Sequence, residues 1–196
     1  VTVTDANNNL LKDSEVTLTA SPENLVLTPN GTATTNEQGQ AIFTATTTVA
    51  ATYTLKAQVS QTNGQVSTKT AESKFVADDK NAELTASSDV QSLVADGKST
   101  AKLEVTLFSA NNPVGGNVWV DIEAPEGVTE KDYQFLPSKN DHFVSGKITR
   151  TFSTSKPGVY TFTFNALTYG GYEMKPVTVT ITAVDADTAK GEEAMK

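Results

Sequence analysis

The chain contains no cysteine, which excludes disulfide bonds, thiolate metal sites and a cysteine nucleophile. It contains a single histidine, His142, so a catalytic triad or a histidine-bearing metal centre would have to be built around that one side chain. No Gly-x-Ser-x-Gly motif accompanies it. We therefore expect His142 to lie at the edge of a loop, and we predict no catalytic residue, no cofactor and no metal ligand.

A long apolar segment is also missing. The sequence has no run of about 18 apolar residues and no charged stretch followed by an apolar one at its N-terminus. Acidic residues outnumber basic ones by 23 to 15, which gives a formal net charge of −8. Such a charge repels both nucleic-acid phosphates and anionic bilayers. We expect neither nucleic-acid binding nor direct membrane insertion of this fragment.

The composition that remains favours β-structure. The chain has 196 residues, of which 37% are hydrophobic, and threonine, valine and alanine dominate over leucine. β-Branched residues fit a pleated, half-buried surface better than a helix. The composition therefore predicts an all-β fold with enough apolar residues for a core.

An internal repeat indicates two structural units. The chain begins VTVTDANNNLLKDSEVTLTA, and it later contains VTLFSANNPVGGNVWVDIEA with the apolar positions kept. A repeat of this length means that the fold is built from units. We therefore expect two tandem domains.

The second repeat contains a complete series of strand-length segments. They are separated by turn signals such as Asp-Gly, Gly-Gly and Pro-Glu-Gly, and their number is typical of an immunoglobulin-like sandwich. In the last but one, Tyr160, Phe162 and Phe164 alternate with threonines, so we predict that these aromatic rings pack between the two sheets. The expected strands are 82–87 with 91–94, 99–108, 117–124, 132–136, 143–153, 158–168 and 172–184.

The first repeat matches only the later part of that series, with expected strands at 1–4, 15–20, 31–35, 40–46, 52–60 and 65–76. Nothing in it corresponds to Ala82–Lys102. We expect an immunoglobulin-like sandwich at 1–78 that lacks its first strand or strands, a complete one at 79–184, and a tail or linker at 185–196. The junction contains neither glycine nor proline, which favours a stiff joint and an extended arrangement.

Three separated motifs resemble the group 1 bacterial immunoglobulin-like domains of the intimin and invasin family. They are Val94–Thr100 (VADGKST), Asn112-Pro113-Val114 and Thr35–Ala41 (TNEQGQA), which occur in the order typical of that family. The resemblance implies a module of a rod that stands on the outer membrane of Gram-negative bacteria. It implies a stalk module first and a receptor-binding module second, because this chain has no cysteine pair and no terminal lectin-like domain.

Two segments with aspartates have features of ligand sites. Asp96-Gly97-Lys98-Ser99-Thr100 ends like a phosphate-binding loop, but Ser92 stands where the first glycine is required, and a strand pattern follows instead of a helix. A tight turn is the better interpretation. Asp78 and Asp79 at the junction could stiffen it by binding Ca²⁺, but no calcium-binding loop motif supports this, so we interpret them as solvated charges.

Two aromatic features are candidate partner-binding sites. Trp119 is out of phase with Val118 and Val120 and should point outward, either as a structural cap or domain contact, or as a binding hot spot. The segment Tyr169-Gly170-Gly171-Tyr172 predicts a two-residue hairpin. Its tyrosines form either a stabilising cross-strand pair or a contact surface for a ligand.

The sequence therefore predicts a non-enzymatic extracellular module of an intimin- or invasin-like adhesin, acting as a rigid stalk or adhesion segment. It would be displayed on the Gram-negative outer membrane or secreted. Its partners would be neighbouring domains of the same chain and a host-cell or bacterial surface protein or glycan. The alternative is a secreted immunoglobulin-like protein that binds one specific protein partner by edge-strand addition or through the tyrosine tip. An enzyme ranks third, because a glycosidase would need two facing carboxylates in a cleft.

Overall fold

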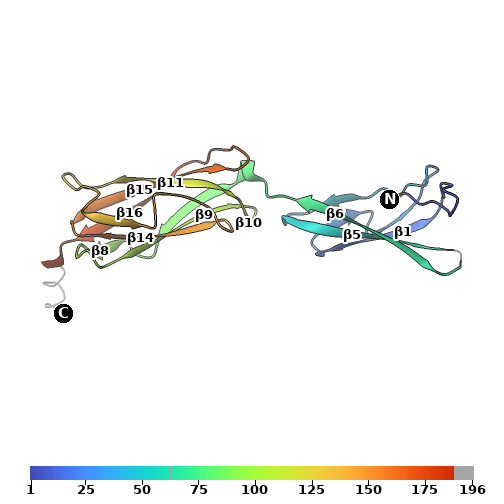
Figure 1. Ribbon diagram of the computed structural model, residues 1–196, viewed down its shortest axis with the longest axis horizontal. Helices are drawn as coiled ribbons and strands as arrows, with labels where there is room; N and C mark the ends of the chain where they lie inside the picture. Colours follow the sequence, from blue (N-terminus) through green and yellow to red (C-terminus); the bar gives the residue numbers. More distant parts are fainter. Residues whose placement is uncertain (62, 188–196) are drawn as a thin grey trace. The chain divides into compact units, whose positions relative to one another are not determined.

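The computed structural model describes residues 1–61 and 63–187. The chain divides into two compact units, Val1–Val76 and Ala77–Lys196 (Figure 1). Over the described ranges the defined elements are β-strands and one short 3-10 helix, η1 at Asp79–Asn81. No helix in this part of the chain is both long enough and apolar enough to cross a membrane. The predicted all-β, immunoglobulin-like fold class is confirmed.

In the first unit a four-stranded antiparallel sheet has the order β3-β1-β5-β6. A second, two-stranded sheet pairs β2 with β4. The N-terminal segment contributes isolated bridges rather than a strand: Thr2 pairs with Gln40 and Thr4 with Leu10. The strands are β1 (Glu15–Ser21), β2 (Val26–Thr28), β3 (Thr32–Thr34), β4 (Thr44–Thr46), β5 (Ala51–Ser60) and β6 (Val66–Phe75).

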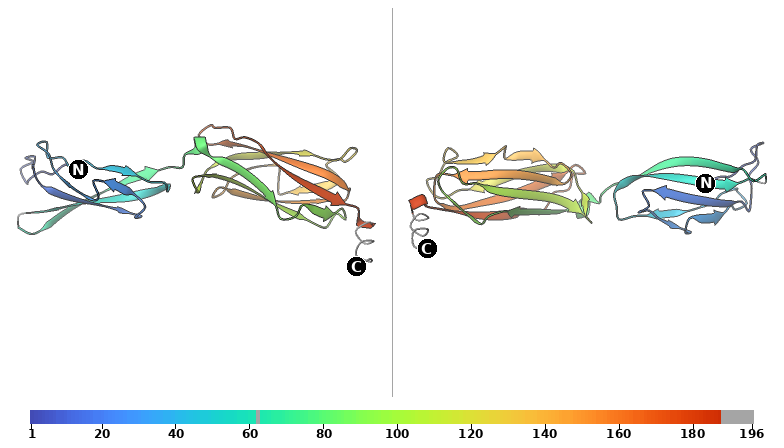
Figure 2. Two further views of the ribbon diagram at one scale, coloured as in Figure 1. Left: turned by 180° about the vertical axis from the view of Figure 1, so that it is seen from behind. Right: turned by 90° about the horizontal axis from the view of Figure 1, so that it is seen from below.

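The second unit is a sandwich of two larger sheets (Figure 2). One has the order β10-β9-β14-β12, with β7 also paired to β9, and the other has the order β13-β11-β15-β16-β8. The last pair, β16 with β8, is parallel. The strands are β7 (Glu83–Ser88), β8 (Ser92–Val94), β9 (Ala101–Ser109), β10 (Asn112–Pro113), β11 (Gly116–Glu123), β12 (Tyr133–Leu136), β13 (Asn140–His142), β14 (Lys147–Thr154), β15 (Gly158–Thr168) and β16 (Val177–Val184).

Aromatic side chains fill the core of the second unit. Tyr160, Phe162 and Phe164 are 0%, 0% and 1% exposed, which confirms that this side of β15 faces the other sheet. Phe152 on β14 meets them from that sheet, with ring centroids 4.9 Å from those of Tyr160 and of Phe162. Aromatic pairs at such separations add to the stability that area burial gives.

Each unit contains its own tyrosine clasp, in which a tyrosine hydroxyl binds the turn before its strand. In the second unit the Tyr160 hydroxyl lies 2.7 Å from Oγ1 of Thr154 and donates to the carbonyl of Lys156. In the first unit the hydroxyl of Tyr53, which is 0% exposed, lies 3.0 Å from Oγ1 of Thr47 and donates to the carbonyl of Val49. In both units the strand that carries the tyrosine is thereby tied to the turn before it.

Several expected strands have different bounds in the structure. The segment expected at 40–46 is a strand only over Thr44–Thr46, and β16 starts at Val177 rather than at residue 172. Three short strands, β2, β10 and β13, were not expected. They are two or three residues long and lie in sequence rich in turn-forming residues, where a period of two cannot be recognised.

Candidate functional site

The structure places Trp119 on the outer face of the sheet β13-β11-β15-β16-β8. Its neighbours on β11, Val118 and Val120, are 2% and 6% exposed and face the core. Successive side chains of a strand point to opposite faces, so Trp119 points away from the core, as the sequence predicted. The side chain is half-buried. In the ladder it stands opposite Asn140 of β13 and Asn165 of β15.

Tyr169 lies at the end of the same face. Its backbone N–H donates to the carbonyl of Gly115, just before β11. A Cβ atom added to Gly115 would lie 2.7 Å from Cδ2 of Tyr169, so the tyrosine ring occupies the space that any larger side chain at this position would need. Gly115, Asn117 and Trp119 are spaced by two residues, so a Cβ atom at Gly115 would point to the same face of the sheet as the Trp119 side chain. The ring of Tyr169 thus lies on the face that carries Trp119, and it is 67% exposed.

The tip Tyr169–Tyr172 is closed by hydrogen bonds to Thr168. The N–H of Thr168 donates to the carbonyl of Tyr172, and the N–H groups of Gly171 and Tyr172 donate to the carbonyl and the hydroxyl of Thr168. A Cβ atom on Gly170 would lie 1.9 Å from Oδ2 of Asp79, so this glycine lies against the carboxylate of η1. The tip is thus a tight turn held at one end of the second unit, and Tyr172 is 41% exposed.

The two sequence-predicted candidates therefore belong to one surface, which we call the aromatic face. Alternation along the strands and the observed register put its side chains on one side of the sheet. The sequence alone did not relate Trp119 to the tyrosine tip, because their common face depends on the register of β15 against β11. The aromatic face comprises Asn117, Trp119 and Asp121 of β11, Asn140 and His142 of β13, Thr163, Asn165 and Leu167 of β15, and Tyr169.

Polar side chains of the aromatic face are held in place by hydrogen bonds. The Asn165 side chain donates from Nδ2 to Oδ2 of Asp121 at 2.9 Å, across the ladder between β15 and β11. At the edge of the sheet, His142 Nδ1 lies 3.3 Å from Oδ1 of Asp141. His142 is the last residue of the short strand β13 and is exposed, so it lies where that strand meets the following loop, as the sequence predicted.

Arg150 anchors this edge strand from inside the sandwich. The guanidinium, 4% exposed on the side-chain scale, donates to Oδ2 of Asp141 at 2.6 Å and to the carbonyl of Ser138 at 2.8 Å. Hydrogen bonds from Arg150 and from the N–H of His142 lower the pKa of the Asp141 carboxyl. Because Arg150 belongs to β14 and Asp141 to β13, the ion pair joins the two sheets behind the aromatic face.

The acidic segments form local hydrogen bonds in the structure. The Asp96 carboxylate accepts hydrogen bonds from the N–H groups of Ser99 and Lys98, which lower its pKa. It therefore occupies the donors that a phosphate would need, and the segment is a tight turn. Asp78 accepts from Nδ2 of Asn81 at 2.6 Å. No group of three or more potential metal-ligating side chains was found among the described residues.

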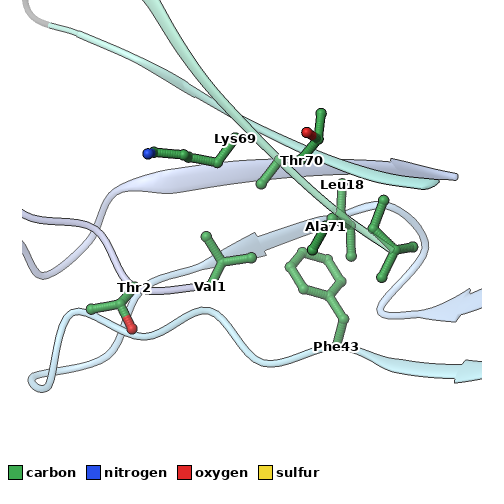
Figure 3. A pocket seen from close by; sticks show the side chains of 9 residues that line it. Val1, Thr2, Leu18, Phe43, Lys69, Thr70 and Ala71 are labelled. Carbon is green, nitrogen blue, oxygen red and sulfur yellow. The ribbon is translucent and has the colours of Figure 1, made fainter. Parts of the chain in front are cut away.

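The first unit contains a cavity of about 450 Å³ that is open to solvent (Figure 3). Leu18, Leu55, Ala57 and Ala71 line it from the four-stranded sheet, and Phe43 lines it from the opposite side. By the tyrosine clasp, Leu55 and Ala57 match Phe162 and Phe164 of the second unit, whose larger rings are buried. Smaller side chains thus leave this space unfilled.

The outer edge of β6 lies near this cavity and differs from its counterpart. In the second unit the matching strand β16 pairs with β8, Thr182 opposite Ser92 and Val184 opposite Val94. Among the described residues β6 pairs with β5 alone and ends the sheet. Its backbone groups on that side are available to an added strand.

The two tandem β-sandwich units make this an all-β, immunoglobulin-like protein. Residues 1–76 match the bacterial Ig-like domain (group 1). The chain is 27% identical over 192 residues to the inverse autotransporter adhesin YeeJ of Escherichia coli K12, a match that covers 96% of the chain and 8% of that adhesin. This chain therefore spans a small fraction of its curated relative.

Solved structures share the fold. InvD of Yersinia pseudotuberculosis aligns with 94% of this chain and 51% of its own, with a TM-score of 0.51 and 17% identity. Invasin, a bacterial integrin-binding protein, aligns with 93% of this chain and 35% of its own, with a TM-score of 0.40 and 22% identity.

The match to the group 1 bacterial immunoglobulin-like domains thus covers the first unit of the chain. The resemblance of the chain to the intimin and invasin family, inferred from its sequence motifs, is confirmed.

Proposed function

We propose that this chain is a non-enzymatic, extracellular segment of a surface adhesin, in which the two sandwiches act as stalk modules and the second presents an adhesive face. The observation that carries the proposal is the match to an adhesin along 96% of the chain. The proposed domains are an immunoglobulin-like sandwich at 1–78 without its first strand or strands, a complete one at 79–184, and a tail at 185–196. Residues 188–196 of that tail lie outside the described residues.

Physical features of each unit support the stalk role. A packed sandwich resists deformation because its sheets are joined by ladders of hydrogen bonds and by an interior of close-packed side chains. Between the end of β6 at Phe75 and the start of η1 at Asp79 the chain has only Val76, Ala77 and Asp78. A connection this short, without glycine, leaves little conformational freedom. We propose that it transmits orientation from one unit to the next.

The proposed location is the outer surface of a Gram-negative bacterium, or the medium after secretion. Antibodies against the purified chain test this on cells that express the parent protein. We expect labelling of intact cells, and removal of the label by brief protease treatment that leaves a periplasmic marker protected. Labelling that requires permeabilised cells would contradict the proposal.

A second candidate function is favoured by the open edge of β6 and the cavity beside it. In this alternative the chain binds one specific protein, which adds a strand to β6 and inserts apolar side chains beside Phe43 and Leu55. A pull-down with the whole chain would recover one saturable partner. Lys74→Pro, which disturbs the β6 edge, would abolish recovery, whereas Lys74→Ala, which keeps the backbone donor at that edge, is the matched control.

A further inference from the structure

We propose that the aromatic face binds an uncharged oligosaccharide, with Trp119 and Tyr169 as the two surfaces on which sugar rings stack. The inference deepens the adhesive part of the proposed function by naming the class of ligand. It assigns the contact to the sheet face of the second unit rather than to a loop cluster or a strand edge.

Two aromatic side chains on the aromatic face are positioned to stack against sugar rings. Tyr169 is 67% exposed, yet its backbone bond to Gly115 and the close approach of its ring to that glycine fix its place. Trp119, at an outward position of the same sheet, is half-buried. A side chain that is already fixed loses little conformational entropy on binding, and its ring offers a flat apolar surface. The C–H face of a pyranose is a matching surface.

The spacing between the Tyr169 ring and Trp119 favours an extended ligand. Gly115, over which the tyrosine ring lies, is four residues before Trp119 on an extended strand, so their Cα atoms are about 13 Å apart. The strand between them carries Asn117 outward. Two rings at such a separation fit a ligand several units long, and a single small molecule could not contact both. The geometry therefore favours an oligosaccharide over a monosaccharide.

Hydrogen-bonding groups lie between and beside the two rings. Three amides, Asn117, Asn140 and Asn165, occupy outward positions of adjacent strands. The bond from Asn165 to Asp121 holds one of these amides in a set orientation. Amide and carboxylate groups that are fixed in place recognise sugar hydroxyls, because both partners can donate or accept. Apolar side chains alone would not provide that recognition.

The charge of the aromatic face favours a neutral ligand. The outward positions of β11, β13, β15 and β16 contain no lysine or arginine, and they carry the carboxylates of Asp121 and Glu123. Such a face repels sulfated or sialylated glycans, and phosphates as well. It has no exposed apolar stretch comparable to a dimer interface, because threonine and asparagine fill most positions. A neutral glycan fits its charge and polarity better than an acidic glycan or a second copy of the chain.

Because Trp119 is the only tryptophan, its fluorescence reports directly on the proposed site. We would titrate the whole chain with hexasaccharides of β-1,4-linked glucose, β-1,4-linked N-acetylglucosamine and α-1,6-linked mannose, with a sulfated heparin hexasaccharide as the charged probe. We expect a saturable change in emission with at least one neutral probe and none with the sulfated one. Calorimetry would measure the same affinities without the fluorophore.

Variants separate the site from the scaffold. We expect Tyr169→Ala and Trp119→Ala each to weaken binding of the neutral probe by about tenfold or more. Thr149→Ala, at an exposed position on the opposite sheet, is the matched control and should leave affinity unchanged. Circular dichroism and the unfolding midpoint of each variant exclude loss of binding through misfolding.

Three results would overturn the inference. The first is the absence of saturable binding of any of the neutral hexasaccharides at millimolar concentration, and the second is binding that neither aromatic substitution weakens. The third is self-association in sedimentation experiments that Trp119→Ala abolishes, which would make the face a contact between copies. None of these results would affect labelling of intact cells, so failure of the glycan site is distinguishable from failure of the proposed surface role.

Discussion

The Tyr160 hydroxyl lies 2.7 Å from the hydroxyl oxygen of Thr154 inside the second unit. The matching tyrosine and threonine of the first unit form the same contact at 3.0 Å. Each unit thus secures the start of its central strand by a polar contact of a tyrosine hydroxyl. Each tyrosine also donates to a carbonyl of the preceding turn.

Removal of these hydroxyls should therefore destabilise the units separately. We predict that Tyr160→Phe and Tyr53→Phe each lower the free energy of unfolding of their own unit by about 1–3 kcal/mol, because buried acceptors lose their donor. Denaturant unfolding followed by circular dichroism measures the effect. Tyr169→Phe, at an exposed ring, is the control and should change the free energy by less than about 0.5 kcal/mol. Equal effects of the three substitutions would contradict the role of the clasp.

The ion pair between Asp141 and Arg150 predicts a dependence of stability on pH. The pKa of Asp141 is lowered in the folded state, chiefly by the hydrogen bond from Arg150. Its contribution to stability is therefore fully present above the ordinary value of 3.8 and is lost as the pH falls below it. We predict that Asp141→Asn destabilises the second unit by about 1–2 kcal/mol at pH 7, less than for a fully buried pair because the carboxylate is partly exposed.

The measurement is the difference in unfolding free energy between the wild-type chain and Asp141→Asn as a function of pH. The difference should shrink as the pH falls from 5 toward 2.5 in steps. His142→Ala serves as the companion variant, since His142 also faces Asp141. It should change the plateau near pH 7 far less than Asp141→Asn. A difference that stays constant over this range would show that the ion pair does not stabilise the sandwich.

Two adjacent glycines should respond differently to alanine. A Cβ atom at Gly116 would lie 2.5 Å from the backbone carbonyl of Leu167, whereas one at Gly115 would meet only the ring of Tyr169. A backbone atom in a sheet cannot move aside, but a side chain can. We predict that Gly116→Ala lowers the unfolding free energy by more than about 2 kcal/mol and that Gly115→Ala lowers it by less than about 1 kcal/mol. Thermal unfolding distinguishes the two, and the reverse order would be inconsistent with the observed contacts.

The cavity of the first unit predicts a stabilising substitution. Ala71 lines the cavity and stands opposite Leu55, where the second unit has Val179 opposite Phe162. We predict that Ala71→Val raises the unfolding free energy of the first unit by about 0.5–1 kcal/mol, because the added methyl groups cover apolar surface of the open cavity. Ser67→Val, on the same strand but outside the cavity, controls for strand propensity alone. An equal gain from both would mean that filling the cavity does not stabilise the unit.

Local periodicity predicted most of the fold. The strand Gly158–Thr168 has the bounds that alternation gave, and its aromatic side chains face the core because every second residue is large and apolar. Strands without such a pattern were missed. Asn140–His142 is polar throughout and is a strand only because it pairs with β11. Its place depends on tertiary contacts that no local pattern reveals.

The candidate site was predictable only in part. The outward direction of Trp119 follows from the alternation of its neighbours. The expected two-residue hairpin with a tyrosine on either side is wrong: Thr168 pairs with Tyr172, and Tyr169, Gly170 and Gly171 form a three-residue turn between them. The expected alternatives for the tip did not include the contact that the structure shows, in which Tyr169 packs over Gly115. The buried Arg150 pairs with Asp141, because β13 closes the side of the sandwich. Both relations join segments whose pairing must be known first.

The central claim is that the two sandwiches are joined with little freedom, so that the chain acts as a stalk. Spin labels at Thr19→Cys and Thr149→Cys test it directly, because both positions are exposed and the chain has no native cysteine. Pulsed electron paramagnetic resonance should give a narrow distribution of distances, which broadens when about ten glycine and serine residues are inserted after Val76. A distribution in the native chain as broad as that of the insertion variant would contradict the claim.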